Sequence, residues 1–185
     1  MKNNLKKVQI GIIGPEEKNI PLLLKEKYLN LAYALGKGLA EKGAILITGG
    51  CNGIVEAACN GAVSVGGITI GTPGPRRGSA ISSVVVEICT PIDVGDYLFA
   101  GTLSSDVIIV FPGDAGTLAE IAIAYRYRKP LILLKGISEG ILEQLFWNVP
   151  QDYPQYIVNT VEEGVTMALN IAEEKLNKDS QNMVM

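Results

Sequence analysis

The residues best suited to chemistry lie in the segment Pro112-Gly113-Asp114-Ala115-Gly116-Thr117-Leu118-Ala119-Glu120. This segment follows the apolar run 107–110 and precedes a helix-like stretch, a pattern typical of a strand, a glycine-rich turn and a helix start. The first N–H groups of a helix have no intrahelical acceptors and carry a partial positive charge, and glycine lets a ligand approach them closely. The segment therefore predicts a site for an anion such as phosphate, with the Thr117 hydroxyl and the Glu120 carboxylate beside it.

The same spacing has a second interpretation. Thr117-x-x-Glu120 is also the pattern of a capping box, in which the threonine caps the helix and the glutamate reaches back to the cap amide. Spacing alone leaves both interpretations open. The flanking glycines and the preceding strand favour the anion site.

Two more glycine-bearing loops follow predicted strands, at residues 11–16 (GIIGPE) and 48–53 (TGGCNG). The carboxyl ends of parallel strands share one edge of a sheet, where ligands bind in doubly wound folds, so we expect the three loops to converge there. The residues predicted to bind a ligand are Gly14, Gly49, Gly50, Asn52, Gly53, Pro112, Gly113, Asp114, Ala115, Gly116 and Thr117.

Two common nucleotide sites do not match the sequence. The first loop is not G-x-G-x-x-G, and the second strand ends in Thr48-Gly49-Gly50, where an NAD site would place its ribose-binding acid. A G-x-x-x-x-G-K-[ST] sequence is also missing. These observations favour a smaller phosphorylated ligand, with no resident cofactor and no bound metal.

Side chains near the other loops have structural explanations. Arg76 and Arg77 follow the third predicted strand and could fold over a phosphate, but a solvated surface loop is the favoured interpretation. Cys51 precedes a predicted helix, which can lower the pKa of a thiol, yet no histidine or lysine stands next to it. We therefore do not predict Cys51 as a nucleophile.

Composition limits the possible functions. The 185 residues are 48% hydrophobic, enough for one buried core, so we expect a single domain over residues 1–176 and a disordered tail at 177–185. The net charge of −3 with only four arginines argues against nucleic acid as a partner. The absence of histidine excludes Ser-His-Asp and Cys-His catalysis. Three unpaired cysteines favour the reducing cytoplasm, and no apolar run is long enough to span a membrane.

Short apolar runs alternate with longer amphipathic stretches along the chain. Such a pattern predicts an α/β fold with a mainly parallel sheet covered on both faces. Because residues 72–82 are too short for a covering helix, the strand order around residues 83–88 stays open. The predicted strands are 8–13, 44–48, 67–71, 84–88, 107–111, 131–134 and 156–158, and the predicted helices are 21–42, 53–65, 95–103, 117–127, 138–147 and 160–176.

The segment from Pro112 to Glu120 resembles the P-G-G-x-G-T-x-x-E signature of the LOG-like superfamily, a group also labelled lysine decarboxylase. The stretch Gly49-Gly50-Cys51-Asn52-Gly53, with Ala57 and Ala58 after it, is similar to the second glycine loop of that superfamily. The resemblance covers about residues 8–136. It implies a Rossmann-like three-layer α/β/α sandwich that forms a homodimer or a higher homo-oligomer.

The resemblance also implies an activity. The LOG enzymes are cytokinin riboside monophosphate phosphoribohydrolases, which hydrolyse the N-glycosidic bond of a nucleoside 5′-monophosphate. By analogy Gly113, Ala115, Gly116 and Thr117 would bind the phosphate, and Glu120 would be the catalytic residue at the ribose or the departing base. Lysine decarboxylation has no support in these residues.

Two departures from the enzyme pattern open an alternative. Asp114 replaces the second glycine of the signature, and residues 96–101 read DYLFAG where the enzymes carry R-K-x-x-M. The chain is closer to a short branch that also resembles molybdenum cofactor carrier proteins. The expected function is binding of a phosphorylated small molecule such as a nucleotide, and the sequence leaves open whether nucleoside 5′-monophosphate phosphoribohydrolase activity follows. The alternative is a non-catalytic carrier or sensor of a pterin-like ligand, for example molybdenum cofactor.

Overall fold

A parallel sheet lies at the centre of the protein. The structure, a computed structural model, describes residues 7–90 and 96–182. In this part of the chain seven strands pair in the order β4-β3-β2-β1-β5-β6-β7, and every pair is parallel. The predicted α/β class and parallel sheet are therefore confirmed. The strands are β1 (Gln9–Ile13), β2 (Ile45–Thr48), β3 (Ile68–Gly71), β4 (Val86–Glu87), β5 (Val107–Val110), β6 (Leu131–Leu134) and β7 (Gln155–Val158).

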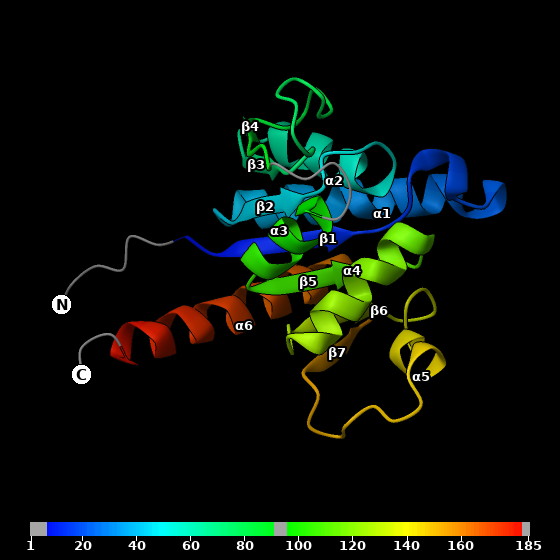
Figure 1. Ribbon diagram of the computed structural model, residues 1–185, viewed down its shortest axis with the longest axis vertical. Helices are drawn as coiled ribbons and strands as arrows, with labels where there is room; N and C mark the ends of the chain where they lie inside the picture. The colour runs from blue at the N-terminus through cyan, green and yellow to red at the C-terminus, as the bar shows by residue number, and fades with distance from the viewer. Residues whose placement is uncertain (1–6, 91–95, 183–185) are drawn as a thin grey trace.

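Helices cover both faces of this sheet. Figure 1 looks onto the face covered by α3 and α4, with α1, α2 and α6 behind the sheet. Contacts between α1 and α2, between α1 and α6, and between α3 and α4 define the two helical layers. The helices are η1 (Glu17–Asn19), α1 (Leu22–Glu41), α2 (Ile54–Val63), α3 (Asp96–Ser104), α4 (Ala115–Arg126), α5 (Ile141–Leu145) and α6 (Val161–Asn182).

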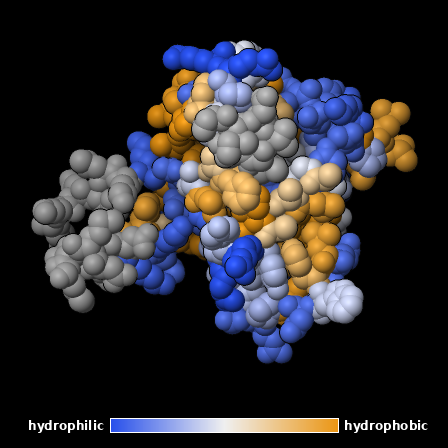
Figure 2. Space-filling model, in the orientation of Figure 1, coloured by the Kyte–Doolittle hydropathy of each residue, from blue (hydrophilic) through white to orange (hydrophobic). Residues whose placement is uncertain are grey.

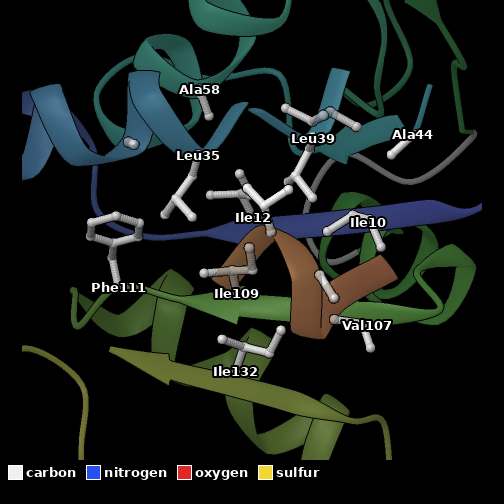
Figure 3. Close-up of a cluster of buried hydrophobic side chains, with 14 of the residues drawn as sticks. Ile10, Ile12, Leu35, Leu39, Ala44, Ala58, Val107, Ile109, Phe111 and Ile132 are labelled. Atoms are coloured by element: carbon white, nitrogen blue, oxygen red, sulfur yellow. The ribbon is translucent and has the colours of Figure 1, made fainter. Parts of the chain in front are cut away.

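The strands form because their apolar runs suit a sheet that is buried on both sides. All four residues of β5 and all four of β6 are buried. Since successive side chains of a strand point to opposite faces, one set packs towards α1 and α2 and the other towards α4 and α5. Figure 3 shows the first set, with Ile12 and Ile109 of neighbouring strands beneath Leu35 of α1.

The structure resolves the strand order that the sequence left open. The predicted strand 84–88 is shortened to β4, which lies at the edge of the sheet beside β3. The hydroxyl of Thr69 fixes residues 83–85, which lead into β4. It donates to the Ser83 carbonyl at 2.6 Å and accepts from the Val85 N–H at 2.9 Å. Hydrogen bonds to a strand residue thus replace the covering helix in this connection.

The last two helices differ in length from the prediction. α5 is shorter than the predicted 138–147, because the Ser138 hydroxyl accepts from the Leu134 N–H at 2.8 Å and holds a turn there. α6 begins with the predicted capping box: the Glu163 N–H donates to the Thr160 hydroxyl at 3.1 Å. It continues to Asn182, beyond the predicted end at 176, since no glycine or proline follows to stop it. The expected tail is therefore helical as far as Asn182, and residues 183–185 lie outside the described part.

We predict that Gly36→Ala destabilises the protein because α1 and α2 touch through their backbones. A Cβ on Gly36 would lie 2.0 Å from the Ala58 carbonyl oxygen, so the two helices must move apart. Urea unfolding should show a loss of about 1–3 kcal/mol, the usual cost of overpacking. Gly164→Ala is the control, because its new methyl group meets no backbone atom, only the side-chain ends of Leu35 at 3.2 Å and Val158 at 3.6 Å. Equal stability of the two variants would contradict the close packing.

Candidate functional site

The candidate site lies at the point where the strand order reverses. β1 connects through α1 to β2 on one side of the sheet, and β5 connects through α4 to β6 on the other side. The two connections diverge at the carboxyl ends of β1 and β5, and such a position is where doubly wound folds bind ligands.

The three glycine-bearing loops meet at this edge, as the sequence predicts. The Ile54 N–H donates to the Pro15 carbonyl at 3.3 Å, and the Glu17 N–H donates to Asn52 Oδ1 at 3.2 Å. The Asn19 side-chain amide donates to Asp114 Oδ2. The first loop is thereby joined to both of the others.

Two of the predicted glycines serve this contact between loops. Gly53 has a φ of +87°, and a Cβ there would lie 2.5 Å from the Pro15 carbonyl oxygen. A Cβ on Gly14 would lie 2.9 Å from both Ile54 and Phe111. These glycines are needed for the close approach of protein segments, whether or not a ligand is present.

The loops enclose a cavity of about 60 Å³. Six of the predicted residues line it, namely Gly14, Gly49, Asp114, Gly116, Thr117 and Glu120. The other predicted residues do not, namely Gly50, Asn52, Gly53, Pro112, Gly113 and Ala115. The sequence did not predict five other lining residues, namely Ile12, Ile13, Glu16, Cys51 and Val55. Glu16 could have been found, because it directly follows Gly14-Pro15 at the end of a strand.

Asp114 caps the amino end of α4. Its Oδ1 atom accepts from the Gly116 N–H at 3.1 Å and from the Thr117 N–H at 3.4 Å. The helix begins at Ala115, so the interpretation of Thr117 and Glu120 as a capping box is wrong. Spacing could not reveal this, because aspartate three residues earlier is an equally good cap. Two of the N–H groups predicted to hold a phosphate therefore already hold the carboxylate of Asp114.

Thr117 lines the cavity and has a side-chain polar atom without a partner in the described part of the chain. The residue is 2% exposed, and its hydroxyl oxygen is buried with no hydrogen-bond partner among the described residues. Leaving a buried hydroxyl unpaired costs about 1–3 kcal/mol. A bound group able to pair with this hydroxyl would recover that free energy.

Two ionisable side chains of the cavity, Glu120 and Cys51, have raised pKa values. Burial, and secondly the nearby Asp114, raise the pKa of Glu120 to about 8. Burial first, then Glu120 and Glu16, raise the pKa of the Cys51 thiol to about 11. At neutral pH Glu120 can therefore donate a hydrogen bond, and Cys51 is a thiol rather than a nucleophilic thiolate.

Most cations of the chain lie away from this cavity. Arg76 and Arg77 are exposed and do not line it. Lys18 lies close by, where its ammonium pairs with Glu16 at 2.8 Å. Within the described ranges, no group of three potential ligand side chains is placed to hold a metal ion. In the same ranges, no helix has the length and apolar character needed to cross a membrane.

The fold and the site together define the class of protein. A doubly wound parallel sheet with glycine-bearing loops around a cavity at its switch point is a Rossmann-like domain. Residues 7–165 match the SLOG cluster4 family, and the chain belongs to that family.

Relatives agree with this assignment. A protein of Archaeoglobus fulgidus is 34% identical over 158 residues, which cover 84% of this chain and 98% of that protein. The molybdenum cofactor binding protein of the phototrophic bacterium Rippkaea orientalis has a similar structure, with a TM-score of 0.74 and 33% identity over 90% of this chain and 98% of that one. The molybdenum cofactor carrier protein of Chlamydomonas reinhardtii gives a TM-score of 0.76 and 29% identity over the same shares.

We predict that Glu120→Gln removes a pH dependence of stability. A glutamate ionises near pH 4.5 when unfolded, whereas Glu120 keeps its proton up to about pH 8 in the folded protein. The stability that its neutral form contributes is thus complete below pH 4.5 and is lost as the pH rises to about 8. Relative to the wild type, the variant should gain at least about 1 kcal/mol between pH 5 and pH 8 in urea unfolding.

Two further variants control this measurement. Asp114→Asn keeps a side chain that can cap α4 but removes the neighbouring charge, so it should lower the pKa of Glu120 and shrink the effect. Glu26→Gln removes an exposed carboxylate on α1 and should show no such gain. Parallel pH curves for the wild type and Glu120→Gln would show that Glu120 is not a buried neutral acid.

Proposed function

We propose that this protein is a carrier that binds a phosphorylated, pterin-type small molecule between the three glycine-bearing loops and releases it unchanged. The observation that carries the proposal is the Thr117 hydroxyl, which is buried beside the amino end of α4 and lacks a partner in the described part of the chain. The names of the similar molybdenum cofactor proteins supply the class of cargo.

The size of the cavity limits how a cargo binds. A volume of about 60 Å³ holds roughly two water molecules, whereas sites that enclose a whole ligand measure about 300–1,000 Å³. Only one small polar group of the cargo enters the cavity, and the ring system lies outside against the loops.

Asp114 turns anion binding into an exchange. Its carboxylate occupies the N–H groups of Gly116 and Thr117, which are the natural seat of a phosphate. A cargo phosphate takes these donors when the Asp114 side chain rotates away from them and from Asn19. Because one anion replaces another at the same N–H groups, the net binding free energy of the cargo is modest. Modest binding suits a protein that must release its cargo.

One observation favours phosphoribohydrolase activity as a second candidate. Glu120 and Asp114 are neighbouring carboxyl groups, and the charge of Asp114 helps to keep Glu120 protonated near neutral pH. Glycoside hydrolysis uses a protonated acid beside a carboxylate. The acid protonates the leaving group, and the carboxylate stabilises the positive charge that develops on the sugar. We rank this function second because the similar structures are named as molybdenum cofactor binding and carrier proteins.

The carrier proposal predicts that Thr117→Val binds cargo at least about tenfold more weakly, since a hydrogen bond to a charged group is lost. Molybdenum cofactor is the probe, and molybdenum that co-elutes with the protein in gel filtration is the measure. The stability of Thr117→Val should stay equal or rise, because the lost hydroxyl has no partner in the described structure. Thr166→Val, an exposed change on α6, should match the wild type in both respects.

The outcomes separate the two functions. Unchanged loading of Thr117→Val would remove the observation on which the carrier depends. In parallel, AMP is incubated with the wild type, with Glu120→Gln and with Glu120→Ala, and free adenine is followed by chromatography. Adenine release by the wild type alone would replace the carrier with the hydrolase.

We also propose a cytoplasmic homodimer formed through α3 and α4. Figure 2 shows apolar surface over these two helices, which expose Phe99, Leu103 and Leu118 by 45%, 36% and 38%. Contiguous apolar surface of this kind marks interaction sites. The three cysteines Cys51, Cys59 and Cys89 are free thiols, as a reducing compartment would keep them.

Leu118→Glu should convert the dimer to a monomer in light scattering, because it places a charge in the middle of this surface. Leu23→Glu is the matched control, since Leu23 is 97% exposed at the start of α1, outside α3 and α4. A wild type that is monomeric at high concentration, or a dimer lost only in Leu23→Glu, would overturn this interface.

A further inference from the structure

A second and larger cavity lies at the opposite edge of the sheet. It has a volume of about 410 Å³, within the range of sites that enclose a small molecule. Figure 1 shows this edge at the left, where the strands begin and where the last turns of α6 extend past the sheet. The cavity is lined by Tyr127, Arg128, Lys129, Pro130, Tyr156, Ile171, Glu174, Lys175 and Lys178.

Cations dominate this lining. Arg128, Lys129, Lys175 and Lys178 contribute four positive charges, against the single carboxylate of Glu174. The whole chain has a net charge of −3, so the charge of this lining is opposite in sign to that of the chain. Such a cluster attracts a small molecule with several negative charges.

Two of the cations are held in position by the protein. The Lys129 ammonium donates to the Ser105 carbonyl at 2.9 Å and to the Leu103 carbonyl, so it stays at the carboxyl end of α3. Arg128 pairs with Asp152 at 2.9 Å. Cations that are already fixed lose little side-chain entropy when an anion binds.

Nearby carboxylates neutralise the cluster only in part, because Asp106, Asp152 and Glu174 stand against four cations. Lys175 lies 3.5 Å from Asp106, yet burial and the charge of Lys175 still lower the pKa of Lys129 to about 8, with Asp106 opposing this effect only in part. After burial, the charge of Lys175 thus affects the pKa of Lys129 more strongly than the charge of Asp106 does. A bound anion would relieve this repulsion.

Two tyrosines give the cavity an aromatic wall. Tyr127 is 57% exposed at the end of α4, and Tyr156 of β7 lines the same space. Tyr156 is half-buried against the core, so Tyr127 is the ring that offers an exposed flat surface to a planar group.

We propose that this second cavity binds a nucleoside di- or triphosphate, with Lys129, Lys175 and Lys178 around the phosphates and the base against Tyr127. The site lies at the amino ends of the strands, whereas the proposed cargo binds at their carboxyl ends. The two sites can therefore be filled and tested separately.

Calorimetric titration of the full chain with ADP and with pyrophosphate tests this site. Lys175→Gln and Lys178→Gln should each weaken both ligands at least about fivefold at low salt, because each removes one phosphate contact. Tyr127→Ala should weaken ADP and leave pyrophosphate unchanged. Lys37→Gln, which removes a half-exposed lysine of α1, and Thr117→Val, which alters the first cavity, should match the wild type.

Proton uptake gives an independent readout. An anion beside Lys129 should raise the pKa of its ammonium from about 8, so binding at pH 8 should take up as much as about half a proton. Titration in two buffers of different ionisation enthalpy measures this uptake. Binding that vanishes in Thr117→Val but survives in Lys178→Gln, or no binding of either ligand, would overturn the proposal. ADP binding no tighter than that of pyrophosphate would overturn the role of Tyr127.

Discussion

The unpaired N–H groups at the start of α4 are the constraint on which the site depends. A helix that begins directly after a central strand must satisfy these donors, and here the carboxylate of Asp114 does so. The same carboxylate accepts from Asn19 and so joins the loop after β5 to the loop after β1. The loop after β2 is joined in turn through Asn52 and Gly53. The shape of the cavity thus follows from how one helix end is capped.

Helix direction explains why the two edges of the sheet differ in charge. In a parallel sheet every crossover helix begins at the carboxyl edge and ends at the amino edge, so helix dipoles make the first edge positive and the second negative. The side chains oppose this pattern. The carboxylates of Glu16 and Asp114 line the carboxyl-edge cavity, while Arg128 and Lys129 lie at the amino edge. Lys129 donates to carbonyls at the end of α3, the negative end of that helix dipole.

The sequence predicted the larger features of the fold because they depend on local patterns. Apolar runs such as 107–110 and 131–134 can be buried only in a sheet covered on both faces, and glycine loops after strands lie at one edge by topology. The sequence did not predict the features of the fold and the site that depend on contacts between residues far apart in the chain. β4 is held by Thr69, sixteen residues before Val85. Asp114 and Thr117 are each plausible caps of one helix, and only packing decides between them. The high pKa of Glu120 arises from burial, which the spacing T-x-x-E does not encode.

Aspartate at position 114 changes what the superfamily signature does in this chain. A glycine there would leave the amides of Gly116 and Thr117 open, and an incoming phosphate would meet a positive helix end without competition. With aspartate, a carboxylate already holds the amides, and Glu120 avoids a second negative charge only by keeping its proton. The Thr117 hydroxyl is then the polar group next to the amides that Asp114 does not use. An anionic cargo would gain that hydroxyl and the amides while Asp114 returns to water, so binding and release differ by one side-chain rotation. Such a balance favours a protein that holds its ligand reversibly over one that must bind a transition state more tightly than its substrate.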